Sequence, residues 1–359
     1  MQISKRKQGP GLAWLSAVLA ILIMATLALQ LSVPARSTDL WWHMALGRHI
    51  LDSGSLIIDH AQFSWTPATS YHVYNSWLTD IILYRVNEWL GTGGLIALRF
   101  LVYFGIVMLA WRHAARLGIA GNPLSWLIIL ISLTVIWVAN EIKPELFSLG
   151  FMSIVVWLYY HMRTQGNQAW RLPYLYPFLL VLWINMHGAF FIASLFFACV
   201  VAGELLNARF SPDQAMPKKL RKHFLIALGL CIPALLLNPF TYELPLEIMG
   251  TLLKNEVAGY SRISAYLPTF IFNFPPHYML DYLIAAMVLF VFLLWQKLKL
   301  RQTDWVVILS FVAYCILFIQ MGRTTAYLAP VFLFAALDLL AEKERSWAWP
   351  VSLSGQILL

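Results

Sequence analysis

Long apolar runs, separated by short basic segments, constrain this sequence more than any other feature. Of its 359 residues, 60% are hydrophobic and only 12% are charged, whereas a soluble domain carries about 25% charge. The first run, 12–33, follows a basic cluster and is longer than the core of about 7–15 residues in a cleaved signal peptide. A run of that length can cross a bilayer as a helix. The sequence therefore predicts an all-α integral membrane protein.

Nine further runs are apolar enough to serve as spans, so we predict about ten transmembrane helices. Their approximate ranges are 93–116, 122–139, 145–162, 173–186, 188–206, 223–239, 280–296, 304–320 and 325–341. With these ranges, seventeen of the 25 Lys and Arg residues fall on one side of the membrane. Because cytoplasmic loops are enriched in Lys and Arg, we predict that this side, with both chain ends, is cytoplasmic.

This topology divides the chain into a transmembrane bundle, 1–341, and a short cytoplasmic tail, 342–359. Two longer segments lie on the outer side, 34–92 and roughly 240–279. The net charge of +8 comes from basic clusters between the spans, so we expect membrane lipids and no nucleic acid as partners. The three cysteines lie inside apolar runs and are interpreted as small core residues, without a disulfide framework or metal site.

The first outer segment concentrates polar and aromatic side chains. Between residues 39 and 80 it holds four of the 17 acids, four of the nine histidines and four tryptophans. These acids and tryptophans are Asp39, Asp52, Asp59, Asp80, Trp41, Trp42, Trp65 and Trp77. Tryptophan gathers at membrane interfaces regardless of function, and stacking on a sugar ring is the functional alternative.

A helix is predicted over 39–52, because apolar residues recur there at helical spacing. Its apolar face is formed by Leu40, Met44, Gly47, Leu51, Trp42, Leu46 and Ile50. Asp39 and His43 project inside that apolar arc, where a carboxylate is costly unless it is paired or used. Other readings stay open: Asp39 caps the helix, His43 bonds a backbone carbonyl, or both bind a metal at i, i+4 spacing. A second helix, 76–90, carries Asp80, which we interpret as structural or solvated.

Several short motifs carry a resemblance to a known superfamily. They are Asp39-x-Trp41-Trp42-His43, Gly47-Arg48, Phe63-Ser64-Trp65-Thr66, Ser76-Trp77-Leu78, Trp183-x-Asn185-x-His187-Gly188-x-Phe190 and Asn238-Pro239. Over roughly residues 10–240 the chain resembles the C-type glycosyltransferases (GT-C), which include oligosaccharyltransferases, protein O-mannosyltransferases and lipid A aminoarabinose transferases.

The resemblance implies a GT-C-like fold, a polyprenyl-phosphate-linked sugar donor and an acid of the first outer loop at the active site. Asp39 is the residue that matches this acid. The chain departs from the larger relatives because it lacks a soluble outer C-terminal domain and an acid-x-acid pair, since Trp41 stands two residues after Asp39. Acceptor type and metal dependence therefore stay open: no cofactor is certain, and a divalent metal is one option.

Two basic residues, Lys143 and Arg323, lie on the predicted outer side, where the charge bias disfavours them. Each suits a leaving lipid phosphate, and the alternative is snorkelling to lipid headgroups. Asn185 and His187 interrupt an apolar run and either line a cavity or bond between helices. Arg99 lies inside its span and is expected to pair with an acid of the bundle.

These features predict an inverting glycosyltransferase that acts on the outer face of the bacterial inner membrane. The catalytic candidates are Asp39 and His43, and the substrate-binding candidates are Trp41, Trp42, Asp59, His60, Lys143, Asn185, His187 and Arg323. The alternatives are a transporter or flippase of lipid-linked substrates and a non-catalytic membrane assembly subunit. A transporter usually shows internal repeats or paired broken helices, and we find one break, near 185–188.

Overall fold

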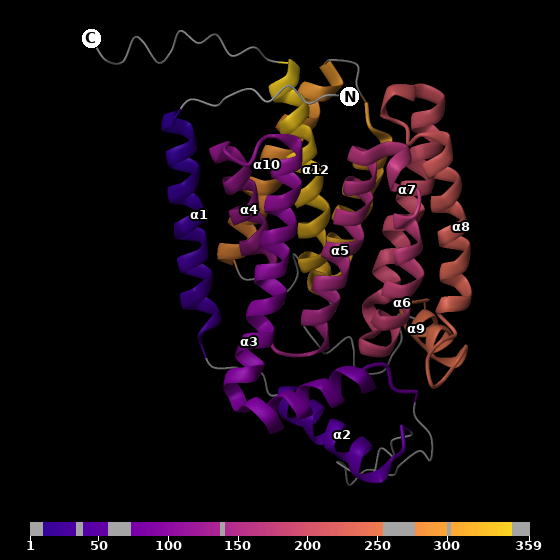
Figure 1. The fold of residues 1–359 in the computed structure, drawn as a ribbon. Coiled ribbons are helices and arrows are strands. Elements are labelled where there is room, and N and C mark those ends of the chain that lie inside the picture. Colours follow the sequence, from indigo (N-terminus) through magenta and orange to yellow (C-terminus); the bar gives the residue numbers. More distant parts are fainter. Residues whose placement is uncertain are drawn as a thin grey trace.

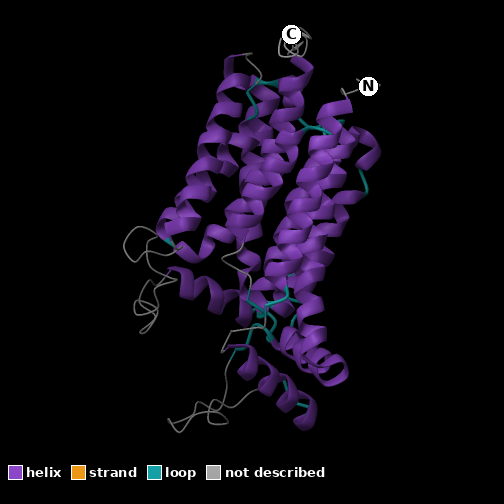
Figure 2. Cartoon of the chain, turned by 90° about the vertical axis from the view of Figure 1, so that its left-hand side faces the viewer, coloured by secondary structure: helices purple, strands orange, loops and turns teal. Residues whose placement is uncertain are grey.

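The computed structural model describes residues 10–33, 39–56, 73–136, 141–253, 277–299 and 303–346, and every regular element in these ranges is a helix. Figure 2 accordingly shows no strand among the described residues. The helices are α1 Pro10–Leu31, α2 Asp39–Ser53, α3 Trp77–Leu117, α4 Pro123–Ile136, α5 Pro144–Gln165, α6 Leu175–Met186, α7 Phe191–Phe210, α8 Lys218–Ala234, α9 Glu243–Leu253, α10 His277–Lys299, α11 Trp305–Gln320 and α12 Thr325–Ser346. Short 3₁₀ turns add η3 Gly166–Ala169, η4 Leu172–Tyr174, η5 Gly188–Phe190, η6 Pro212–Gln214 and η9 Gly322–Thr324.

Most of these helices stand side by side in one bundle, and α2 lies across one end of it (Figure 1). The start of α1 and the end of α12 lie at the opposite end. At the centre, α12 packs against α3, α4, α5, α10 and α11. Its residues from Thr325 to Leu337 are all buried. A helix enclosed on every side must be apolar on every side, which explains why the run 325–341 lacks an amphipathic pattern.

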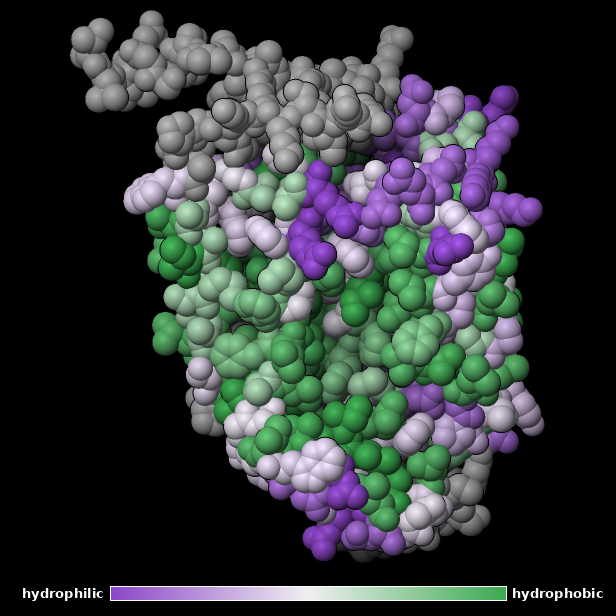
Figure 3. All heavy atoms as spheres, in the orientation of Figure 1, coloured by the Kyte–Doolittle hydropathy of each residue, from purple (hydrophilic) through white to green (hydrophobic). Residues whose placement is uncertain are grey.

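The surface of the bundle has the character of a membrane protein. Hydrophobic residues cover the middle of the face in Figure 3, and hydrophilic residues gather towards its two ends. Within the described residues, three helices are long and apolar enough to cross a membrane: Trp14–Leu31, Trp77–Leu117 and Gly188–Phe210. Shorter apolar helices accompany them, and each of the ten predicted segments overlaps a described helix.

α3 joins two predicted helices, 76–90 and 93–116, into one element of 41 residues. The joint is Gly91, whose backbone has φ 61° and ψ −162° and interrupts the helical geometry. Glycine adopts this positive φ without the steric penalty that a Cβ imposes. At 1.5 Å per residue, α3 is about twice as long as the hydrocarbon core is thick, so its first part extends beyond a single span. That first part bends towards α2 (Figure 1).

The expectation for Arg99 was wrong. Its buried guanidinium donates hydrogen bonds to two backbone carbonyls, of Leu31 and of Val33 at 2.5 Å. No described acid forms an ion pair with it. Because the last carbonyls of a helix have no partner within that helix, Arg99 serves as a side-chain cap for the end of α1.

A buried polar network joins α5, α7 and α11 at the end of the bundle where α1 begins. Arg163 in the last turn of α5 donates to one carboxylate oxygen of Asp304 and to the carbonyl of Gln214 at 2.7 Å. The other oxygen of Asp304 accepts from Asn207 and from the backbone N–H of Val306, both at 3.0 Å. Asp304 therefore caps α11 and fixes it against its neighbours.

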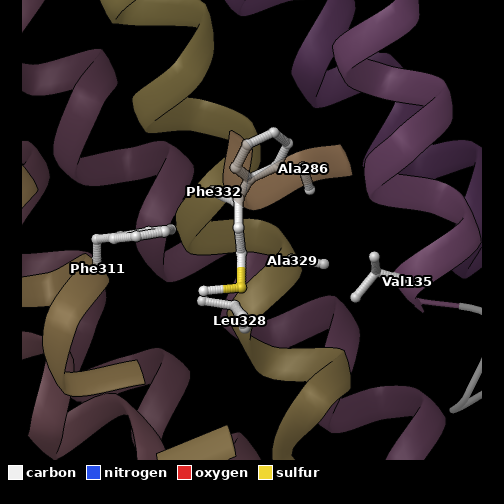
Figure 4. Close-up of a pocket in the computed structure, with 7 residues that line it drawn as sticks. Val135, Ala286, Phe311, Leu328, Ala329 and Phe332 are labelled. Atoms are coloured by element: carbon white, nitrogen blue, oxygen red, sulfur yellow. The ribbon is translucent and has the colours of Figure 1, made fainter. Parts of the chain in front are cut away.

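A small apolar cavity of about 10 Å³ lies between α4, α10, α11 and α12 (Figure 4). Its walls are Val135, Ala286, Met287, Phe311, Leu328, Ala329 and Phe332. A cavity needs roughly 10–15 Å³ and several polar partners to hold a water molecule, and none of these side chains carries nitrogen or oxygen. We interpret it as a packing void rather than a binding site.

Candidate functional site

The candidate site lies where α2 crosses the first part of α3. Gly47 of α2 faces the backbone of α3, and a Cβ added at Gly47 would overlap the carbonyl group of Asp80. The absence of a side chain at Gly47 therefore sets how closely the two helices approach. Leu40 and Met44 of α2 pack with Leu83 and form the apolar part of this contact.

Replacing Gly47 with alanine is expected to lower the free energy of unfolding by about 1–3 kcal/mol, because backbone atoms cannot make room for the added methyl group. Thermal unfolding of the detergent-solubilised protein would measure this loss. Gly105→Ala in α3 is the matched control, since a Cβ there meets no atom within 4 Å. Equal stability of the Gly47 variant and the parent would show that α2 does not pack on α3 in this way.

The close approach of α2 and α3 brings three polar side chains together. Asp80 is 0% exposed, and one of its carboxylate oxygens lies 2.7 Å from Nδ1 of His43. Its other oxygen accepts a hydrogen bond from the hydroxyl of Tyr74 at 2.5 Å. Of the two interpretations of Asp80, structural or solvated, the burial of its carboxylate against His43 excludes the solvated one.

The protonation of this cluster follows from its surroundings. Burial, and then the negative charge of Asp80, raises the pKa of Tyr74 well above the usual value of a phenol. The hydroxyl therefore keeps its proton and serves as a donor to Asp80. His43 is buried on the inner face of α2, as the helical pattern predicts.

Two tryptophans border His43 on α2. Trp42 stacks on the imidazole with ring centroids 4.1 Å apart, yet it is 43% exposed. The ring thus covers the buried imidazole and is itself exposed at the surface. Trp41 is also exposed and forms no described stacking contact with His43. Both rings remain available at the surface for a substrate or for the membrane interface.

Asp39, the first residue of α2, lies outside the apolar arc. Its side chain is 47% exposed, which corrects the predicted burial. One carboxylate oxygen lies 3.6 Å from Nζ of Lys143. The same amine lies 2.8 Å from Glu141 and 3.2 Å from Glu145, so three carboxylates surround one cation. The structure thus brings together two of the predicted site residues, the acidic Asp39 and the basic Lys143, from distant parts of the chain.

The break between α6 and η5 holds polar side chains in a bonded network. Asn185 accepts a hydrogen bond from the indole of Trp77 at 3.0 Å and donates to the carbonyl of Leu237 at 2.8 Å. His187 lies 2.7 Å from the hydroxyl of Ser148. Asn185 therefore links helices, as the structural alternative predicts, and His187 remains only partly buried beside the break.

An open groove of about 510 Å³ runs along this region. Its walls are Trp77, Leu78, Val181, Leu182, Asn185, Leu236, Leu237, Asn238 and Pro239. The lining is mainly apolar, and the amide of Asn185 is held by its bonds to Trp77 and to the backbone.

Three predicted site residues are not placed in detail. Asp59 and His60 lie outside the described residues. Arg323 lies in η9, between α11 and α12, and its side chain is outside the described part of the chain. Among the residues that the structure describes, no group of three or more His, Cys, Asp or Glu side chains is placed to hold a metal ion. The metal reading of Asp39 and His43 therefore gains no third ligand.

Two members of the site, Asp80 and Tyr74, were missed in the sequence. A signal for Asp80 was present, because it lies three residues from both Trp77 and Leu83 and so shares the inner face of its helix. Tyr74 lies in a non-helical segment, where no periodic pattern marks its orientation.

No protein-family model matches this chain, and no curated protein matches it.

Proposed function

We propose that this protein is an inverting glycosyltransferase that moves a sugar from a polyprenyl-phosphate donor to an acceptor on the outer face of the bacterial inner membrane. The observation that carries the proposal is the half-exposed carboxylate of Asp39 beside the amine of Lys143, at the end of the bundle that α2 crosses. This pair places a negative and a positive charge, both of which the reaction needs, at one end of an apolar helical bundle. The motif resemblance to C-type glycosyltransferases supplies the donor class and a GT-C-like fold.

Each charge has a chemical role. A carboxylate that accepts the proton of the acceptor hydroxyl makes the oxygen a better nucleophile, as the base of an inverting glycosidase does. The ammonium group of Lys143 stabilises negative charge on the departing phosphate. Glu141 and Glu145 hold Lys143 in place. Arg323 is our candidate for a second cation near the phosphate.

The proposed topology has ten spans, with both chain ends in the cytoplasm and α2 outside. The basic loops support this orientation. In a cysteine-free background, Ser55→Cys, just after α2, is expected to react with an impermeant thiol reagent added to intact vesicles whose exposed face is the outer face of the inner membrane. Ser211→Cys, between α7 and α8, is the control for the opposite side and is expected to react only after permeabilisation. The reverse pattern would show that the orientation is inverted.

A transporter or flippase is the second candidate, because the chain leaves helical geometry at His187, between α6 and η5. Transporters often bind their substrates at such breaks. Here the flanking Asn185 and the ring of His187 bond to neighbouring elements, which ties the break to the rest of the bundle. The transferase is therefore the better supported of the two.

The test of the proposal is transfer of a labelled sugar from a polyprenyl-phosphate donor by the purified protein in liposomes. We expect product that increases with time and with protein concentration. Movement of the labelled lipid between leaflets without any transfer would replace the proposal with the flippase. If both activities are absent, across a panel of donor sugars and with partner proteins added back, the non-catalytic assembly subunit is the alternative that remains.

A further inference from the structure

Asp80, Tyr74 and His43 form a buried cluster that the roles of Asp39 and Lys143 do not use. The side chains of His43 and Asp80 are 8% and 0% exposed. They come from α2 and α3, and Tyr74 comes from the segment that precedes α3. Removing a carboxylate from water costs several kcal/mol unless good hydrogen bonds compensate. Both oxygens of Asp80 have such a bond, one with His43 and one from Tyr74.

The hydrogen bonds determine which nitrogen of His43 carries a proton. Burial raises the pKa of Asp80, whereas its contacts with His43 and Tyr74 favour the ionised form. The ionised carboxylate can only accept, so Nδ1 of His43 is then the donor to Asp80. In a neutral imidazole the other nitrogen, Nε2, then carries a lone pair and can accept a proton. No hydrogen bond to Nε2 is present among the described residues, and Trp42 covers one face of the ring. The edge that carries Nε2 is thus the reactive edge of His43.

Asp39 lies one helical turn before His43 on α2. Side chains at i and i+4 of a helix are neighbours, with Cβ atoms about 5–6 Å apart. This spacing makes Nε2 of His43 the candidate acceptor for a proton taken up by the carboxylate of Asp39. We propose that His43 is the second station for this proton, and that Asp80 and Tyr74 are positioning residues that hold its ring for the task.

The relay role depends on the proposed transferase, and its steps balance. The acceptor O–H bond breaks, its proton passes to Asp39, and the oxygen electron pair forms the new bond to the anomeric carbon. The bond from that carbon to the phosphate oxygen breaks, and the phosphate leaves with the electron pair. The proton then moves from Asp39 to Nε2 of His43, and the imidazolium forms an ion pair with Asp80. Loss of the proton to water returns the site to its starting state.

The charges around His43 make Asp80 the main control on its proton affinity. Among the described residues, Asp80 is the charged group in direct contact with the imidazole, and Tyr74 is the polar neutral group on the same side. Asp39 lies one turn away on α2 and shares the charge of Lys143 with Glu141 and Glu145.

Nuclear magnetic resonance of ¹⁵N-histidine in the full-length protein, in lipid nanodiscs, tests the arrangement without any enzyme activity. His43→Gln assigns the signal. We expect a ring protonated at Nδ1 at neutral pH. Asp80→Asn should lower the proton affinity of His43 at least tenfold, because the imidazolium loses its counter-charge. Tyr74→Phe should shift the proton affinity in the opposite direction, since the Asp80 charge is then less neutralised by hydrogen bonding.

Opposite shifts in these two variants support the arrangement, and unchanged or parallel shifts overturn it. If Asp80→Asn does not fold, the rise in the proton affinity of His43 in Tyr74→Phe decides the question alone. The relay role has a separate readout in the pH dependence of kcat. The acid limb, where protonated His43 cannot accept, should move by about one unit to lower pH in Asp80→Asn. An unmoved limb in an active enzyme overturns the relay, whereas absence of transfer in the parent contradicts only the proposed function and the relay that rests on it.

Discussion

Replacing Arg163 with methionine is expected to lower the free energy of unfolding by about 3–5 kcal/mol, the cost of breaking a buried ion pair on one side. Asp304, its partner, has a side chain that is only 1% exposed. Without the guanidinium, the carboxylate keeps its bonds from Asn207 and the N–H of Val306 but loses its counter-charge. The carbonyl of Gln214 also loses a charged donor. Methionine keeps much of the length of the apolar stem, so the loss reports mainly on the charge.

Unfolding of the detergent-solubilised protein by heat or denaturant would measure this effect. Arg48→Met is the control, because Arg48 forms an exposed pair with Asp52 on α2, and exposed pairs of this kind contribute about 0.3–0.5 kcal/mol. Adding Asp304→Asn to the Arg163 variant should restore part of the stability, since the double variant no longer buries an unpaired charge. A single Arg163 variant as stable as the parent would contradict the network described here.

Asp39→Asn is expected to reduce sugar transfer roughly 100-fold or more, while the protein remains folded and inserted. Asparagine keeps the shape of the side chain and remains an acceptable first residue for α2, so any role as a helix cap is preserved. The pair with Lys143 contributes at most about 1 kcal/mol, because the Asp39 side chain is half exposed. The variant therefore separates a base from a structural residue.

Turnover with a fixed polyprenyl-phosphate sugar donor, measured beside thermal stability, checks this expectation. Asp52→Asn is the matched control: it makes the same chemical change on the same helix, at an exposed side chain paired with Arg48. It should transfer sugar at the parent rate. An Asp39 variant that is stable and equally fast would remove Asp39 from the site and leave His43 as the candidate base.

Helix positions could be read from the sequence because their causes are local. The apolar run of α1, the first helical turn at Asp39 and the central segment of α12 each follow from a window of neighbouring residues. Backbone hydrogen bonds within a helix connect residues four apart, so no distant partner is needed. The same local reasoning placed His43 on the buried face of α2.

The site itself depends on residues that are far apart in the chain. His43 and Asp80 are 37 positions apart, and Trp77 and Asn185 are 108 apart. Helical spacing predicts which side chains share a face of one helix, but not which residues of other helices lie opposite that face. Asp39 shows the limit of helical spacing as a guide. The spacing predicts that its side chain lies inside the apolar arc of α2, whereas the packing of α2 on α3 leaves its carboxylate half exposed.

Tertiary packing also decided how the buried charges are neutralised. Arg99 meets carbonyl groups at the end of α1 rather than an acid, and Asp80 meets His43 rather than water. In each case the buried charge needs a partner, because an unpaired charge is costly away from water. Which partner it found depended on the close approach of helices, such as the one that Gly47 permits between α2 and α3.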